Sequence, residues 1–203
     1  MGPMSEQTQH GLAGIILAGG RSRRMGQDKA SLEWEGRPML QVIAESIGER
    51  CTPVMVAAPA TSQAYDELAG QSELAWITDE QAGSGPLGGI VAALTAAKEA
   101  DASAAFVCAT DLPLVSSQLI DELLHALTGT PDVVIPFVDG RDHPLAGIYR
   151  VRALPALQAK LASGDVLMRD ALEAVVTHRV GVSDPRWLTN VDAPEDLHRL
   201  RTA

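Results

Sequence analysis

Short apolar runs alternate with amphipathic segments along most of the chain. Four of the runs are continuously apolar rather than alternating, as expected for strands that are buried on both faces of a sheet. These runs are residues 14–18, 53–58, 74–77 and 104–109. Strands buried on both faces are typical of a parallel sheet covered by helices, so the pattern predicts an α/β protein.

The segments between these runs carry apolar residues at spacings of three and four, which is the period of an amphipathic helix. The three clearest sets are Leu40, Ile43 and Ile47; Ile90, Ala93, Leu94 and Ala97; and Leu119, Leu123, Leu124 and Leu127. Regular alternation of strands and helices predicts a doubly wound, three-layer α/β/α fold with a mostly parallel sheet.

The second half of the chain predicts an antiparallel addition to this sheet. Two strands at 133–136 and 145–149 are close in sequence and joined through Asp139-Gly140, a sequence that favours a hairpin turn. Helices near 151–162 and 166–174, a run at 176–182 and a last helix from Pro194 follow. Because no linker or repeat interrupts the pattern, we expect one domain over 11–203. Residues 1–10 are expected to be a polar tail, either disordered or added during cloning.

Composition narrows the class of protein. Aromatic residues make up only 3% of the 203 residues, so the core must consist of Ala, Val, Leu and Ile. The formal net charge of -10 argues against a nucleic acid partner, which usually requires a basic surface. Cys51 and Cys108 lie in separate apolar runs, which favours buried free thiols in a reducing compartment. Neither a membrane helix nor a secretory signal is recognisable, so the sequence predicts a soluble cytoplasmic protein.

A glycine-rich basic loop follows the first predicted strand and reads Gly19-Gly20-Arg21-Ser22-Arg23-Arg24-Met25-Gly26-Gln27-Asp28-Lys29. Glycine lets backbone N–H groups approach an anion, and Arg and Lys donate charge-assisted hydrogen bonds to phosphate oxygens. The dinucleotide-binding fingerprint G-x-G-x-x-G is absent, because Gly19 and Gly20 are adjacent and the next glycine is Gly26. A Walker A loop has four residues between its glycines, whereas five separate Gly20 from Gly26. The alternative is a solvated basic turn. In so acidic a chain, the loop favours a triphosphate site.

Carboxylates follow two of the other predicted strands. Asp111 follows the run 104–109 and Asp79 follows the run 74–77, and ligands of open α/β sheets bind at the carboxyl ends of strands. Magnesium binds one or two carboxylates together with substrate phosphates, so Asp111 is the first candidate metal ligand. Both residues also have a simpler interpretation, as turn residues before a helix.

The string from Leu17 to Lys29 resembles the L-A-G-G-x-S-x-R-M-G-x-D-K signature of the molybdenum cofactor nucleotidyltransferases. The resemblance extends from Gly14 to Leu200 and implies a Rossmann-like nucleotidyltransferase fold. It also implies transfer of GMP from GTP to molybdopterin, with Mg²⁺ as the cofactor and Mn²⁺ as its substitute. Transient contact with molybdoenzymes or other proteins of cofactor biosynthesis follows from the same resemblance.

Two other functions remain open at this stage. One is a cytidylyltransferase acting on molybdopterin or on a sugar-like phosphate, and the other is a non-catalytic nucleotide-binding module. The segment Ala57-Ala58-Pro59 bears on the first alternative, since related enzymes often have Asn at the end of this strand. A polar contact to the nucleotide is therefore missing. The resemblance thus defines the identity of the nucleotide base less well than the type of reaction.

The resemblance assigns roles to single residues. Arg21, Arg24 and Lys29 would neutralise the departing pyrophosphate. The segment 108–113 resembles the family's metal-binding segment, and the segment 189–197 resembles its closing element. Asp111 and Asp192 would thus bind the metal, although Asp192 has an equally good interpretation as a helix N-cap. The nucleotide would be contacted by Leu17, Ala18, Gly19, Gly20, Lys29, Asp79 and Asp111.

The acceptor side is the least defined part of the predicted site. Arg141 and His143 lie in a segment that resembles the R-x-H-P element of the guanylyltransferase branch, in which Arg would pair with the acceptor phosphate. Arg169 lies where the family has a basic helix that seats the pterin, and Asn190 lies in the closing element. A surface loop for His143 and a solvated helix position for Arg169 are the alternatives.

Overall fold

The computed structural model describes residues 11–18, 32–59, 65–66, 69, 74–78, 85–164, 166–192, 196 and 200. Within them, one mixed sheet has the strand order β10-β7-β9-β6-β1-β4-β5, and β8 pairs with β7. The strands are β1 (Leu12–Leu17), β4 (Val54–Ala58), β5 (Ala75–Thr78), β6 (Ala104–Ala109), β7 (Val133–Val138), β8 (Arg141–Asp142), β9 (Ala146–Arg150) and β10 (Thr177–Val180). Pairing is parallel except where β9 meets β6 and β7 and where β8 meets β7.

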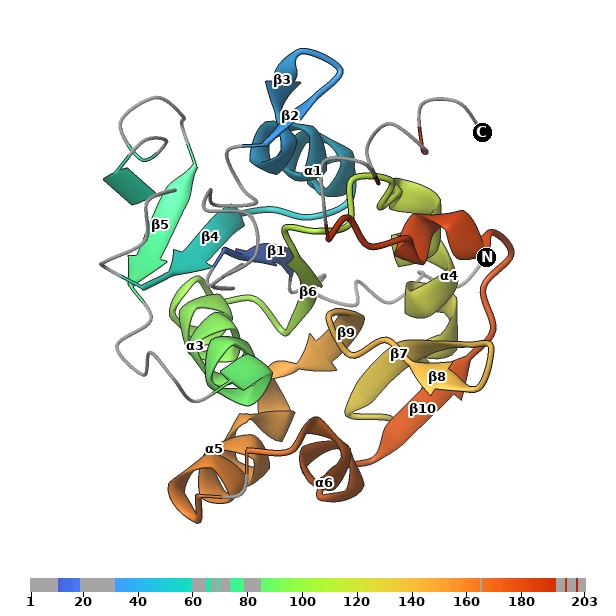
Figure 1. Cartoon of the computed structure of the whole chain (residues 1–203). Coiled ribbons are helices and arrows are strands. Elements are labelled where there is room, and N and C mark those ends of the chain that lie inside the picture. Colours follow the sequence, from blue (N-terminus) through green and yellow to red (C-terminus); the bar gives the residue numbers. More distant parts are fainter. Residues whose placement is uncertain are drawn as a thin grey trace, which may run out of the picture.

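Helices cover both faces of the sheet (Figure 1). One face packs against α1 (Met39–Gly48), α4 (Ser117–Ala126) and the short 3-10 helix η3 (Pro185–Leu188). The other face packs against α3 (Gly85–Glu99), α5 (Leu154–Ala162) and α6 (Met168–Glu173), and η2 (Val151–Ala153) precedes α5. In β1, Ile16 points into the first core and Ile15 into the second, as strand alternation requires. The predicted three-layer α/β fold with a mostly parallel sheet is confirmed.

The predicted antiparallel hairpin is also confirmed. Val133 in β7 lies opposite Tyr149 in β9, and the turn residues Asp139 and Gly140 have φ angles of 50° and 75°. Two successive residues with positive φ match the twist of a tight hairpin. The sequence did not predict that β9 inserts between β6 and β7, nor that β8 forms at the tip.

A few local predictions differ from the structure. Leu124 was grouped with the buried residues of its helix but is 36% exposed, because it lies at the edge of the face formed by Leu119, Ile120 and Leu123. A small hairpin of β2 (Glu33–Trp34) and β3 (Arg37–Pro38) was not predicted, because strands of two residues are too short to show alternation. The helix expected from Pro194 falls mostly outside the described residues.

Both cysteines are free and buried, as predicted. Burial raises the pKa of Cys51 to about 12, so its thiol stays neutral at physiological pH. Cys108 lies at the centre of the sheet in β6, where burial also raises its pKa. Among the helices of the described segments, none is long and apolar enough to cross a membrane.

Candidate functional site

The carboxyl ends of the parallel strands meet at one edge of the sheet. β1 ends at Leu17, directly beside Ala57 of β4 and Ala109 of β6. Helix α3 packs closely on this end of β1, since a Cβ added to Gly89 would lie 3.1 Å from Leu17 Cδ1. A side chain at position 89 would therefore press against Leu17, at the end of the strand that leads into the predicted phosphate loop.

Three residues predicted to contact the nucleotide lie at this edge within the described chain, namely Leu17, Ala18 and Asp111. Leu17 is half-buried and Ala18 is buried. The Ala18 N–H donates to the Ala57 carbonyl at 2.8 Å, so this N–H extends the β1–β4 ladder rather than facing a nucleotide. The other predicted residues of the phosphate and nucleotide site lie outside the described residues; these are Gly19, Gly20, Arg21, Arg24, Lys29 and Asp79.

Asp111 lies in the turn that follows β6 and is half-buried. Its carbonyl oxygen accepts a hydrogen bond of 2.8 Å from the N–H of Val191. Val191 is fully buried, and the next residue, Asp192, is exposed and has its N–H bonded to Asp196 Oδ2 at 2.9 Å. The fold thus brings together the segments that carry two predicted metal ligands, although these residues are 81 positions apart in the sequence.

This arrangement fits a magnesium ion. Magnesium is usually held by one or two carboxylates and completes its octahedral shell with water and substrate phosphates. Asp111 and Asp192 supply that number of carboxylates on two segments joined by a backbone hydrogen bond. No group of three or more His, Cys, Asp or Glu side chains suited to a metal occurs among the described residues. Binding of the ion would therefore depend on the phosphates of the substrate.

Further contacts fix the segment that leads from β10 to Asp192. The carboxylate of Glu122 in α4 accepts hydrogen bonds from the N–H of Ser183, at 3.0 Å, and from its hydroxyl group. Leu188 in η3 is buried against the same core as Val191. Sequence reasoning missed the contribution of Glu122 and Ser183, because a pairing over 61 positions leaves no local pattern.

The hairpin tip holds the acceptor candidates Arg141 and His143. Arg141 is exposed in β8, and His143 is half-buried just beyond it. The His143 N–H donates to the Pro136 carbonyl at 2.9 Å, and the buried Tyr149 hydroxyl donates to the Pro144 carbonyl at 2.7 Å. Partial burial lowers the pKa of the His143 imidazole, an effect that Asp142 and Asp139 oppose. This shift favours the neutral form of the ring, which can both donate and accept hydrogen bonds.

The two remaining acceptor candidates lie on opposite faces of the sheet. Asn190 is exposed between the buried residues Leu188 and Val191, on the side of α1 and α4. Arg169 is exposed in the first turn of α6, on the side of α3, and its Nε lies 3.0 Å from the Oδ1 of Asp170. Its role in seating a pterin remains a prediction.

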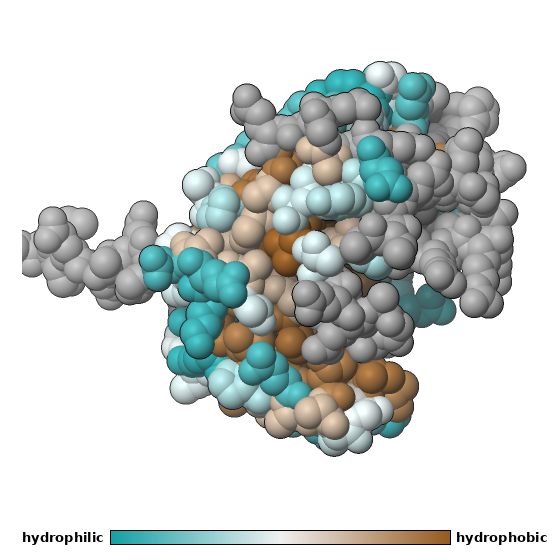
Figure 2. All heavy atoms as spheres, turned by 90° about the vertical axis from the view of Figure 1, so that its left-hand side faces the viewer, coloured by the Kyte–Doolittle hydropathy of each residue, from teal (hydrophilic) through white to brown (hydrophobic). Residues whose placement is uncertain are grey.

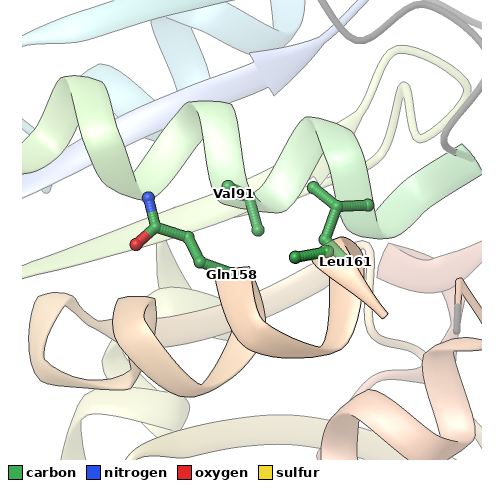
Figure 3. Close-up of a pocket in the computed structure, with 4 residues that line it drawn as sticks. Val91, Gln158 and Leu161 are labelled. Carbon is green, nitrogen blue, oxygen red and sulfur yellow. The ribbon is translucent and has the colours of Figure 1, made fainter. Parts of the chain in front are cut away.

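A shallow hollow of about 270 Å³ lies between α3 and α5 and is lined by Val91, Gln158, Leu161 and Ala162 (Figure 3). Figure 2 views the molecule from the left-hand side of Figure 1. It shows hydrophobic surface over the lower part of that side, where Figure 1 places α3 and α5. None of the predicted site residues lines the hollow. We therefore assign it to helix packing rather than to substrate binding.

Comparison with known proteins identifies close relatives. Residues 14–180 match the family model described as the MobA-like NTP transferase domain. A "Probable molybdenum cofactor guanylyltransferase" of Mycobacterium avium is 40% identical over 195 residues, which cover 95% of this chain and 96% of that protein. A relative of the same name from Mycobacterium marinum is 41% identical over 189 residues, covering 92% of this chain and 91% of that protein.

The fold is shared with solved structures. Molybdopterin-guanine dinucleotide biosynthesis protein A from Archaeoglobus fulgidus superposes with a TM-score of 0.78 at 23% identity. The superposition covers 93% of this chain and 96% of that chain. The arrangement of strands and helices described above is therefore that of a known group of structures.

Proposed function

The chain belongs to the family of MobA-like NTP transferases, and we propose that it transfers GMP from GTP to molybdopterin, forming molybdopterin guanine dinucleotide and pyrophosphate. The observation that carries this proposal is the similarity over nearly the whole chain to relatives named as probable molybdenum cofactor guanylyltransferases. The hydrogen bond between Val191 and Asp111 supports it, because it brings two carboxylate-bearing segments to the strand ends.

The proposed reaction is an in-line displacement at the α-phosphorus of GTP. An oxygen of the molybdopterin phosphate attacks this phosphorus and forms a new P–O bond. The bond from the α-phosphorus to the oxygen that bridges it to the β-phosphorus breaks, and pyrophosphate leaves. The acceptor is already an anion, so no protein nucleophile is required. The enzyme's main task is to hold two phosphate groups that repel each other.

The chain's own residues would divide this task between the two substrates. Arg21, Arg24 and Lys29 would neutralise the charge that develops on the departing pyrophosphate. Asp111 and Asp192 would hold Mg²⁺, or Mn²⁺ in its place, and the bound ion would supply a positive charge that polarises the α-phosphate. Arg141 and His143, with Asn190 and Arg169, would bind the acceptor.

We extend the proposal to the setting of the reaction. The protein would act in the cytoplasm, where its buried cysteines remain reduced. Its product would pass to molybdoenzymes, or to other proteins of cofactor biosynthesis, through transient contacts. Co-purification of a molybdoenzyme with the tagged protein from cell extract would support such a transfer.

A nucleotide panel tests the proposed function. The purified protein would be incubated with molybdopterin, Mg²⁺ and one of GTP, CTP, ATP or UTP, and pyrophosphate release would be measured. We expect release with GTP to be fastest and to require molybdopterin. Faster release with CTP would instead indicate a cytidylyltransferase. Tight binding of GTP without release from any nucleotide would indicate a non-catalytic nucleotide-binding module.

A further inference from the structure

A bidentate ion pair holds the hairpin that carries Arg141 and His143. Arg179 in β10 donates from Nε to Asp142 Oδ1 at 2.8 Å and from Nη2 to Asp142 Oδ2 at 3.0 Å. Asp142 stands directly between Arg141 and His143 in the sequence. Two parallel hydrogen bonds between a guanidinium and a carboxylate fix direction as well as distance. The pair therefore constrains the orientation of the hairpin tip.

The ion pair reaches across β7. Asp142 lies opposite Phe137 of β7, whereas Arg179 lies opposite Ile135 of the same strand. Ile135 and Phe137 are two positions apart, so their side chains point to the same face of the sheet. Backbone pairing between β10 and β7 ends at Pro136. The β7–β8 hairpin continues past this point, to Phe137 and Val138. The pair of Asp142 and Arg179 thus links β8 to β10 where the backbone pairing of β10 with β7 ends.

The neighbouring Arg141 belongs to the opposite face. It lies opposite Val138, and successive residues of a strand alternate between faces. Val138 packs against the core that contains Leu188 and Val191, the residues that precede Asp192. The hairpin is therefore held on one face while Arg141 lies on the face covered by the segment that carries Asn190 and Asp192.

From this geometry we propose that Asp142 and Arg179 are positioning residues for the acceptor. The ion pair keeps the hairpin tip oriented so that Arg141 and His143 meet the phosphate of molybdopterin. Neither Asp142 nor Arg179 touches the substrate in this account. The inference rests on the proposed function and deepens it, since it names what orders the acceptor side of the site.

The chain offers a matched control. Arg50 makes the same bidentate pair with Asp121, at 2.7 Å from Nε and 2.9 Å from Nη2, and the arginine side chains are similarly exposed, at 41% for Arg50 and 40% for Arg179. Arg50 follows α1 near the amino end of β1, since the Thr52 N–H donates to the carbonyl of Leu12 at the start of that strand. The control pair therefore lies at the other end of the parallel strands from the candidate site. A purely structural loss should affect both variants alike.

The test compares steady-state kinetics of Arg179→Gln and Arg50→Gln with the wild type. We expect Arg179→Gln to raise the KM for molybdopterin roughly fivefold, as the loss of one well-formed ion pair would. The KM for GTP should stay close to the wild-type value, and Arg50→Gln should change neither constant. An unchanged KM for molybdopterin, or an equal rise of both KM values, would overturn the proposal.

The partner variant tests whether the two residues act as a unit. Asp142→Asn should raise the KM for molybdopterin to the same extent as Arg179→Gln. The double variant should then be no worse than either single variant, because the second substitution has no pair left to break. Additive effects of the two substitutions would contradict a shared role.

A further readout does not depend on the reaction. Hydrogen–deuterium exchange of the backbone amides in 139–145 should become faster in Arg179→Gln and stay unchanged in Arg50→Gln. If the wild type fails to transfer GMP to molybdopterin, the proposed function is wrong, but this measurement still tests the hairpin. Equal protection of 139–145 in the wild type and in Arg179→Gln would overturn the positioning role.

Discussion

Asp111 joins three features of the candidate site in one residue. It follows the central strand β6, it is half-buried, and its carbonyl group anchors the segment that carries Asp192. The side chain can be changed without removing the backbone hydrogen bond from Val191. Substitution of this carboxylate therefore separates its chemical role from its structural one.

We predict that Asp111→Ala lowers guanylyl transfer by about 10²-fold or more, because the carboxylate proposed to bind the metal is lost. Initial rates would be measured over a range of Mg²⁺ concentrations. Thermal unfolding of the variant should resemble that of the wild type, which would exclude a folding defect. An unchanged dependence on Mg²⁺ would remove Asp111 from the site.

Gly147 shows how tightly the antiparallel addition is packed. A Cβ at this position would lie 2.7 Å from Ile135 Cγ2 and 3.0 Å from the Val134 carbonyl oxygen. We expect Gly147→Ala to lower the free energy of unfolding by about 1–3 kcal/mol, the usual cost of overpacking a core. Urea denaturation would measure it. Gly181→Ala is the control, because nothing lies within 4 Å of a Cβ at Gly181, and an equal loss there would refute the packing explanation.

At the scale of elements, the helix after the turn that carries Asp111 begins with a defined cap. The hydroxyl of Ser116 accepts a hydrogen bond of 3.1 Å from the N–H of Gln118 and so caps α4. Helix α4 in turn holds the closing segment through Glu122 and Ser183. The start of α4 is therefore part of what places Asp192 near Asp111.

Loss of this cap should be measurable. Ser116→Ala is expected to lower the free energy of unfolding by about 1 kcal/mol, the usual contribution of an N-cap serine. Ser116→Asp should retain most of the stability, because Asp accepts the same hydrogen bond and favours a helix N-terminus. Chemical denaturation would compare the three proteins, and equal stability of Ser116→Ala and the wild type would contradict the role of the cap.

Elements that follow local rules could be predicted from the sequence. The buried strands β1, β4 and β6 appeared as continuous apolar runs, and the Asp139-Gly140 turn had the residues that a tight hairpin requires. The β2–β3 hairpin was missed because each of its strands has only two residues, whereas the insertion of β9 between β6 and β7 depends on contacts between distant segments. Such contacts leave no periodic pattern in the sequence.

The same limit applies to the candidate site. Asp111 and Asp192 could be selected because each follows a recognisable strand end or motif. The hydrogen bond that joins their segments, and the pairing of Asp142 with Arg179, arise only when the sheet assembles. The sequence thus offered candidate residues for the chemistry, whereas the structure was needed to find the contacts that hold their segments.

For the molecule as a whole, ion pairs of carboxylates make the free energy of unfolding depend on pH. Burial tends to raise the pKa of Asp132, but the hydrogen bonds from the Val176 N–H and from Arg152 outweigh it, and the pKa is lowered overall. A carboxyl whose pKa is lower in the folded state stabilises the protein above its unfolded pKa, near 3.9. That stabilisation is lost as the pH falls through the folded value.

We therefore predict that Asp132→Asn reduces the loss of stability on acidification. The free energy of unfolding would be measured at pH 7 and at about pH 3, below the usual Asp pKa. The difference between the two pH values should be smaller in Asp132→Asn than in the wild type. Asp139→Asn, at an exposed turn whose positive φ suits Asn, serves as the control. An undiminished acid effect in Asp132→Asn would contradict the assignment.

The most direct test of the account follows a labelled phosphate. The purified protein would be given molybdopterin, Mg²⁺ and GTP labelled at the α-phosphate, and the products would be separated and identified by mass spectrometry. If GMP is transferred to molybdopterin, the label should appear in molybdopterin guanine dinucleotide, and unlabelled pyrophosphate should form in equal amount. Label that stays in GTP, or CMP transfer from labelled CTP in a parallel reaction at a higher rate, would contradict the proposed transfer.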